Sequence, residues 1–168
     1  MTTNGLHAEF VDRLERHRGI LLKVAGAYCH RLADREDLVQ EMIVALWRAY
    51  GGFGGRAAFS TWMYRIAVNV AISFRRREAR RPHETGTASD AILQLTAPEP
   101  ETDESLAALR ALIGELDPLN RALMLLYLDD CPQAEIAEIL GISATNVATK
   151  IGRIKERLKR EAAGRSYR

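Results

Sequence analysis

Residues 145–157 carry polar and basic side chains of the types that read base pairs in duplex DNA. Asn146 can pair bidentately with adenine, and Lys150 and Arg153 can donate hydrogen bonds to guanine. The full set recurs at helical spacing: Thr145, Asn146, Thr149, Lys150, Arg153 and Arg157. This pattern predicts a recognition helix that lies in the DNA major groove.

A second candidate surface begins at residues 51–59, which read GGFGGRAAF. Glycines break the chain into a loop, and aromatic and guanidinium groups beside flexible backbone suit stacking on unpaired bases. A polar stripe continues along the following helix, and the predicted set is Phe53, Arg56, Thr61, Arg65, Asn69 and Arg76. Phe59 and Trp62 are assigned to the core. The arginines at 75–77, 80 and 81 are predicted to contact phosphates.

A third candidate surface is the outward face of residues 37–48. Val44 and Trp47 widen the apolar stripe of this segment beyond what a small core requires, and acids flank them. An indole beside acids is typical of protein interfaces, although a solvated helix face fits the spacing equally well. The set is Asp37, Gln40, Glu41, Val44, Trp47 and Arg48.

Helices must position all three surfaces, because apolar residues recur at three- and four-residue steps and no strand pattern competes. The expected helices cover roughly 7–28, 35–50, 60–77, 106–117 and 119–128, followed by a helix-turn-helix. Ser60 is expected to cap the third helix, with Phe59 stapled against Tyr64.

The helix-turn-helix prediction depends on the stretch 133–159. Gly141 can adopt the left-handed conformation that ends the first helix, and Ser143 can cap the second. Val147, Ile151, Ile154 and Leu158 then form the buried stripe of the second helix.

The charge distribution divides the chain into two basic blocks around an acidic middle. The balance is +6 over residues 1–82, −7 over 83–120 and +3 over 121–168. Residues 83–104 combine acids with Pro, Ser, Thr and Gly, which is typical of a flexible linker, and the apolar segment 92–95 interrupts them. We therefore expect an all-α protein with helical domains at 7–82 and 105–163.

Other sites are not expected. Cys29 and Cys131 stand far apart, and the four histidines are scattered, so neither a disulfide framework nor a metal site is predicted, and no cofactor. The chain lacks a signal-peptide pattern and an apolar run of membrane-spanning length, which predicts a cytoplasmic protein without membrane insertion. It also lacks a heptad repeat, which favours a monomer.

Three motifs in order resemble the extracytoplasmic-function sigma factors of the sigma-70 family. They are DREDLVQEMIVALWRAY at 34–50, FSTWMYRIAVN at 59–69 and AEIAEILGIS at 134–143, and the resemblance covers about 7–160. It implies that the 37–48 surface docks on the beta-prime clamp helices of RNA polymerase core. The loop and helix at 53–77 would recognise and melt the −10 promoter element, and the C-terminal helix would read the −35 element. The beta flap and an anti-sigma factor are further implied partners.

Two other classes of protein compete with this interpretation. A stand-alone helix-turn-helix regulator would bind a palindrome as a dimer, and the sequence offers no dimer helix. A DNA-processing enzyme would need a catalytic constellation, but no Ser or Cys stands in a recognisable His/Asp set. A sigma factor that binds polymerase core and directs transcription initiation, and that is not an enzyme, is the preferred hypothesis.

Overall fold

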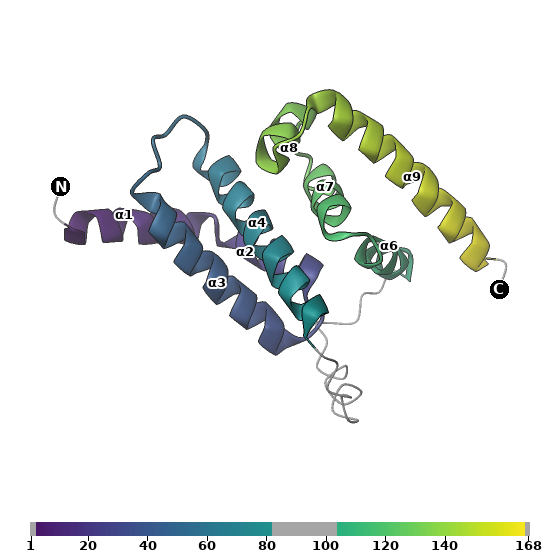
Figure 1. The fold of residues 1–168 in the computed structure, drawn as a ribbon, viewed down its shortest axis with the longest axis horizontal. Helices are drawn as coiled ribbons and strands as arrows, with labels where there is room; N and C mark the ends of the chain where they lie inside the picture. Colours follow the sequence, from purple (N-terminus) through teal and green to yellow (C-terminus); the bar gives the residue numbers. More distant parts are fainter. Residues whose placement is uncertain (1–2, 82–103, 167–168) are drawn as a thin grey trace.

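The computed structural model describes residues 3–81 and 104–166, and both stretches consist of helices joined by short turns (Figure 1). The all-α prediction is therefore confirmed. Positions 83–103 of the expected linker, including the apolar segment 92–95, lie outside the described residues.

The N-terminal bundle contains α1 Thr3–Arg16, α2 Arg18–Tyr28, α3 Leu32–Tyr50 and α4 Phe59–Arg80. The prediction of one helix over 7–28 was wrong, because the chain turns at His17 (φ −114°, ψ 12°). The amide of His17 still donates to the Leu14 carbonyl at 3.1 Å. The turn separates α1 from α2, and α2 packs against both α3 and α4.

The start of α4 also differs from the prediction. Extended Ala58 (φ −57°, ψ 145°) is the N-cap residue and gives no side-chain cap, so Ser60 lies inside the first turn. Phe59 contacts Phe53 and Trp62 at ring distances of 5.5 and 5.3 Å. Phe59 is the first residue of the helix and not the residue before the N-cap, which is the position that a hydrophobic staple requires.

The C-terminal bundle contains α6 Glu104–Gly114, α7 Pro118–Leu128, α8 Gln133–Leu140 and α9 Ala144–Ser166. Asp117 caps α7 by accepting from the Asn120 amide at 3.2 Å, and Pro118 occupies the first turn, where its missing N–H costs nothing.

The helix-turn-helix has the predicted local chemistry. Gly141 adopts φ 68° and ψ 34° at the end of α8. Ser143 Oγ accepts from the Asn146 amide at 3.1 Å at the start of α9. The expected stripe of Val147, Ile151, Ile154 and Leu158 is buried. These predictions are confirmed.

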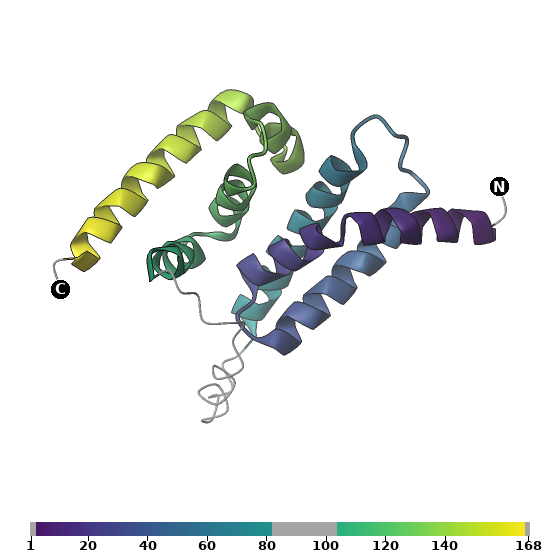
Figure 2. The same cartoon turned by 180° about the vertical axis from the view of Figure 1, so that it is seen from behind.

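The two bundles pack against each other, with α7 against α2 and both α7 and α8 against α4 (Figures 1 and 2). Buried Arg121 of α7 donates to the Ala27 carbonyl of α2 at 3.4 Å, and its guanidinium lies 5.4 Å from the ring centre of Tyr28. The Tyr28 hydroxyl donates to the Pro118 carbonyl at 2.6 Å. The predicted domains therefore form one closed arrangement in this structure.

Candidate functional site

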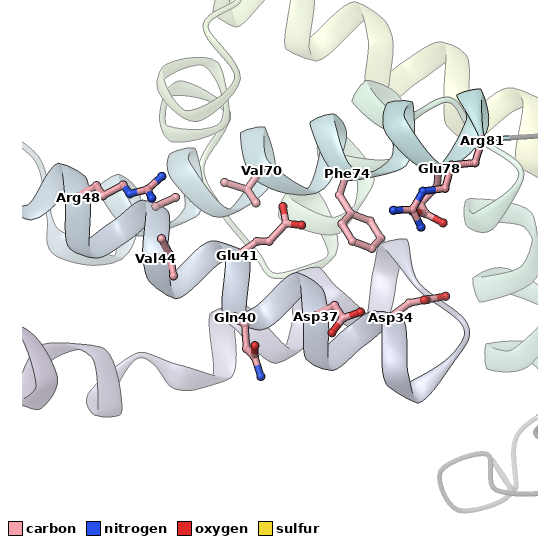
Figure 3. A pocket seen from close by; sticks show the side chains of 11 residues that line it. Asp34, Asp37, Gln40, Glu41, Val44, Arg48, Val70, Phe74, Glu78 and Arg81 are labelled. Carbon is pink, nitrogen blue, oxygen red and sulfur yellow. The ribbon is translucent and has the colours of Figure 1, made fainter.

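A groove of about 620 Å³ runs between α3 and α4 and contains most of the surface predicted at 37–48 (Figure 3). Its lining consists of Asp34, Asp37, Gln40, Glu41, Val44, Ala45, Arg48, Val70, Phe74, Glu78 and Arg81. The helical period brings the α3 residues to one side, and α4 supplies the opposite wall. Five of the six predicted residues thus line one feature, and Trp47 does not.

The groove combines an apolar centre with an acidic rim. Val44 is 46% exposed, whereas Leu38, Met42 and Leu46 of the same helix are fully buried. The carboxylate of Glu41 accepts from Arg77 of α4 at 2.6 Å, and Glu78 pairs with Arg81 at 3.1 Å. Exposed apolar atoms between carboxylates suit an amphipathic helix that carries basic residues at its edges.

Trp47 lies beside this groove but belongs partly to the core. Its indole contacts the rings of His7 and Phe10 of α1 at 5.4 and 5.2 Å, and 37% of the residue remains exposed. Trp47 therefore holds α1 against α3, and only its exposed part is available for the partner contact predicted for it.

The loop before α4 is built on an aromatic cluster. Phe53 is half-buried and contacts Tyr50 and Trp62 at ring distances of 6.2 and 5.0 Å. The Arg13 guanidinium lies 5.6 Å from the centre of the same ring, within range of a cation–π interaction. Phe53 is thus held in place by its neighbours, whereas Arg56 is exposed at the loop surface.

The polar stripe of α4 is only partly available in this arrangement. Arg65, Asn69 and Arg76 are exposed on one side of the helix, as expected. Thr61 is buried, and its hydroxyl donates to Glu135 of α8 at 2.8 Å. The prediction of Thr61 as a surface residue was therefore wrong for the closed chain, because α8 covers it.

The recognition surface predicted on α9 is displayed as expected. Thr145, Asn146, Thr149, Arg153 and Arg157 are exposed and Lys150 is half-buried. The Thr149 hydroxyl donates to the Thr145 carbonyl at 2.9 Å, which leaves its methyl group for apolar contact. Arg157 donates to Glu161 at 2.6 Å, and this hydrogen bond raises the pKa of the Arg157 guanidinium.

A polar cluster between the bundles was not foreseen from the sequence. The Asp129 carboxylate at the end of α7 accepts from both Lys23 of α2 and Tyr64 of α4. Burial raises the pKa of Asp129, but the hydrogen bonds from Lys23 and Tyr64 outweigh it and hold the pKa below its ordinary value. No pattern could have identified this cluster, because its members are 65 and 106 residues apart.

The two cysteine side chains show no sign of a catalytic or metal-binding role. Cys29 is buried and Cys131 half-buried, both as free thiols, and burial raises the pKa of each to about 11. Within residues 3–81 and 104–166, no three His, Cys, Asp or Glu side chains are grouped to hold a metal ion. No helix in those stretches is both long and apolar enough to cross a membrane.

Comparison with known proteins identifies two family modules. Residues 14–81 match Sigma-70 region 2, and residues 106–158 match Sigma-70, region 4. The ECF RNA polymerase sigma-E factor of Haemophilus influenzae is 32% identical over 82% of this chain and 80% of its own. The ECF RNA polymerase sigma factor SigG of Mycobacterium tuberculosis is 29% identical over 90% of this chain. The chain spans only 48% of the length of SigG.

Two solved structures have the same fold. CnrH, in complex with the cytosolic domain of CnrY, matches 94% of this chain and 90% of its own with a TM-score of 0.68 and 26% identity. The sigma factor RpoE of Bartonella quintana, in complex with the anti-sigma factor NepR, has a TM-score of 0.70 over 90% of this chain and 95% of its own. Its 18% identity makes it evidence for the fold alone.

Proposed function

Because this chain belongs to the extracytoplasmic-function group of the sigma-70 family, we propose that it binds bacterial RNA polymerase core and directs the enzyme to promoters. The observation that carries the proposal is the combination of surfaces on one chain. An acid-rimmed groove on α3 and α4 suits a protein partner, and separate faces of α4 and α9 suit DNA.

We assign the surfaces as follows. The groove around Val44 docks on the beta-prime clamp helices. The loop at 51–58 and the exposed stripe of α4 bind the −10 element as single strand, and α9 reads the −35 element as duplex beside the beta flap. Polymerase fixes the distance between the two DNA-binding modules. Once one module has bound its DNA element, the other is held near its own element at a high effective concentration, which strengthens its binding.

No catalytic side chain is required for this role. Promoter opening extrudes bases at a cost of a few kcal/mol, and binding of the extruded base offsets that cost. The chain therefore acts as a non-enzymatic initiation factor, and its site of action is the cytoplasm. Since the sigma factor RpoE of Bartonella quintana was solved with the anti-sigma factor NepR, and CnrH with the cytosolic domain of CnrY, a regulatory protein of anti-sigma type is a further proposed partner.

The decisive experiment is run-off transcription with purified core polymerase, together with a pull-down of core by the chain. Val44→Glu places a charge at the apolar centre of the groove and is expected to abolish both signals. Leu22→Glu is the matched control, because Leu22 is exposed and lies outside the groove. Polymerase-independent binding of a palindromic operator, without core association, would support the stand-alone regulator instead.

A further inference from the structure

The loop between α3 and α4 is anchored to the bundle by one aromatic ring. The Phe53 amide donates to a carbonyl at the end of α3 at 3.0 Å, and the Phe53 ring packs against Phe59 and Trp62 at 5.5 and 5.0 Å. Gly55, two residues further on, has the left-handed φ of 68° that glycine adopts at low cost. A loop so rich in glycine loses much conformational entropy when it becomes ordered, so its order depends on this anchor.

A side chain of the first helix reaches the anchor. The Arg13 guanidinium carbon lies 5.6 Å from the centre of the Phe53 ring and 5.7 Å from that of Phe59, both within range of a cation–π interaction. The two rings stand nearly perpendicular to each other, at 84°, so one planar cation contacts both. Helix α1 crosses the end of α3 from which the loop leaves (Figure 2), and Phe10 contacts Tyr50 there.

Glu9 orients the Arg13 guanidinium on these rings. It stands one turn earlier on α1, and its Oε1 accepts from Arg13 Nε at 3.1 Å and lies 2.9 Å from Arg13 Nη2. Burial, followed by a hydrogen bond with the same carboxylate, raises the pKa of the Tyr50 phenol. Glu9 and Arg13 are both half-buried, which limits the access of water to their ion pair. The guanidinium is therefore held between a carboxylate and two rings.

We propose that Arg13 is a positioning residue for promoter opening. Its guanidinium holds Phe53 and Phe59 in place, and the loop that they anchor is ordered before it meets single-stranded DNA. Arg56, three residues after Phe53, is exposed on this anchored loop. A loop that is already ordered loses less conformational entropy on binding. The proposal rests on the proposed function, because it takes the loop to be part of the −10-binding surface.

Arg16 of the same helix provides a matched control. It pairs with Asp12, four residues earlier, at 2.9 Å, as Arg13 pairs with Glu9. The Arg16 side chain is 71% exposed, whereas that of Arg13 is 39% exposed. R16M therefore removes an arginine and an ion pair from α1 without uncovering the rings that R13M uncovers.

The test measures the loop and its function separately in the full chain. Trp62 lies 5.0 Å from Phe53 and serves as the optical probe of the anchor. The chain has two tryptophans, so a W47F background leaves Trp62 alone, and acrylamide quenching then measures its exposure. The functional assays use R13M, R13K and R16M with Trp47 retained. Permanganate footprinting with core polymerase measures opening, a pull-down measures core binding, and circular dichroism checks that each variant is folded.

R13M is expected to increase the quenching of Trp62 and to slow opening about fivefold relative to R16M, because it removes the cation from both rings. Core binding should equal that of R16M. R13K keeps the charge but has no planar group to lie against two rings, so it should recover only part of the opening rate. If R13M does not fold, R13K takes its place in the comparison with R16M.

Three results would overturn the proposal. The first is quenching and opening in R13M that match R16M. The second is a parallel loss of core binding in R13M, which would make Arg13 a general support of the bundle. The third is a weaker salt dependence of promoter binding in R13M that R13K restores in full, which would show that the charge itself contacts a phosphate.

Run-off transcription with core polymerase distinguishes this inference from the function on which it rests. A chain that transcribes equally well with R13M and R16M keeps its function, and Arg13 loses its role. A chain whose Trp62 is uncovered by R13M, but which never supports transcription, keeps the anchored loop and loses the assignment as an initiation factor.

Discussion

Arg77 of α4 donates to the Glu41 carboxylate of α3 across 2.6 Å, so an arginine predicted to contact phosphate neutralises an acid predicted to contact polymerase. Both side chains are about half exposed, and such pairs contribute little to stability. Either partner can therefore exchange this contact for another at small cost. The groove and the DNA-facing side of α4 share one ion pair.

The exposed stripe of α4 is expected to act in promoter opening and not in polymerase binding. Arg65→Ala and Asn69→Ala should each slow opening about tenfold, because a polar contact to a base edge is worth about 1–3 kcal/mol. Permanganate footprinting measures opening, and a pull-down measures core binding. Glu15→Ala, at an exposed position of α1 away from the stripe, should change neither. Loss of core binding in the first two variants would contradict the assignment.

The recognition helix is expected to separate base contacts from phosphate contacts. Arg153→Ala should reduce discrimination between −35 sequences about tenfold, since a bidentate pair with guanine contributes about 1–3 kcal/mol. Lys159 pairs with Glu156 at 3.2 Å, away from the centre of this face. Lys159→Ala should therefore leave the discrimination between −35 sequences unchanged and alter at most the salt dependence of DNA binding. Holoenzyme binding to matched and mismatched duplexes at two salt concentrations measures both effects, and equal losses on every sequence in Arg153→Ala would refute the base-contact role.

Arg121 is expected to be the most sensitive polar position for folding. It donates to the Leu116 carbonyl at 3.1 Å and to those of Ala27 and Gly114, so Arg121→Met leaves three carbonyls without this donor. The expected loss is about 2–4 kcal/mol of unfolding free energy, because buried acceptors without donors are costly. Urea denaturation provides the value, and Arg121→Lys should recover part of it. A change of less than about 0.5 kcal/mol in Arg121→Met would show that solvent replaces the guanidinium.

Acid is expected to remove the stabilising contribution of Asp129. Its folded-state pKa lies below the ordinary value of 3.8, so the carboxylate stabilises the fold fully above that value. The contribution is lost as the pH falls through the folded-state pKa. The stability difference between the wild-type chain and D129N should therefore be constant near neutral pH and shrink below about pH 4. Urea denaturation from pH 3 to pH 7 tests this, and a difference independent of pH would assign the effect of D129N to packing.

The helix-turn-helix was predictable because its signals are local. Gly141 and Ser143 set the turn and cap through their own backbone and side-chain chemistry, and the stripe ending at Leu158 follows from the helical period. The groove was predictable in part for the same reason, since Asp37 and Val44 lie on the face that the core does not use.

The error at Thr61 arose because this residue is governed by a distant segment. Thr61 has the residue type and spacing of a surface position, but Glu135 lies 74 residues away and buries it. The period of a helix indicates which face is covered and not what covers it. The break at His17 has no Gly or Pro at that residue to indicate it. Its ring Nδ1 lies 2.9 Å from the Arg13 carbonyl.

The thiol of Cys131 lies near the contact between the two bundles. It stands two residues after Asp129 and close enough to Tyr64 to influence that phenol electrostatically. Burial, and then the charges of Glu135 and Asp129, raise the pKa of the Cys131 thiol to about 11, so few thiolates form at neutral pH while the bundles are together. Alkylation of this native thiol at neutral pH is therefore expected to be slow, because the thiolate is the form that reacts.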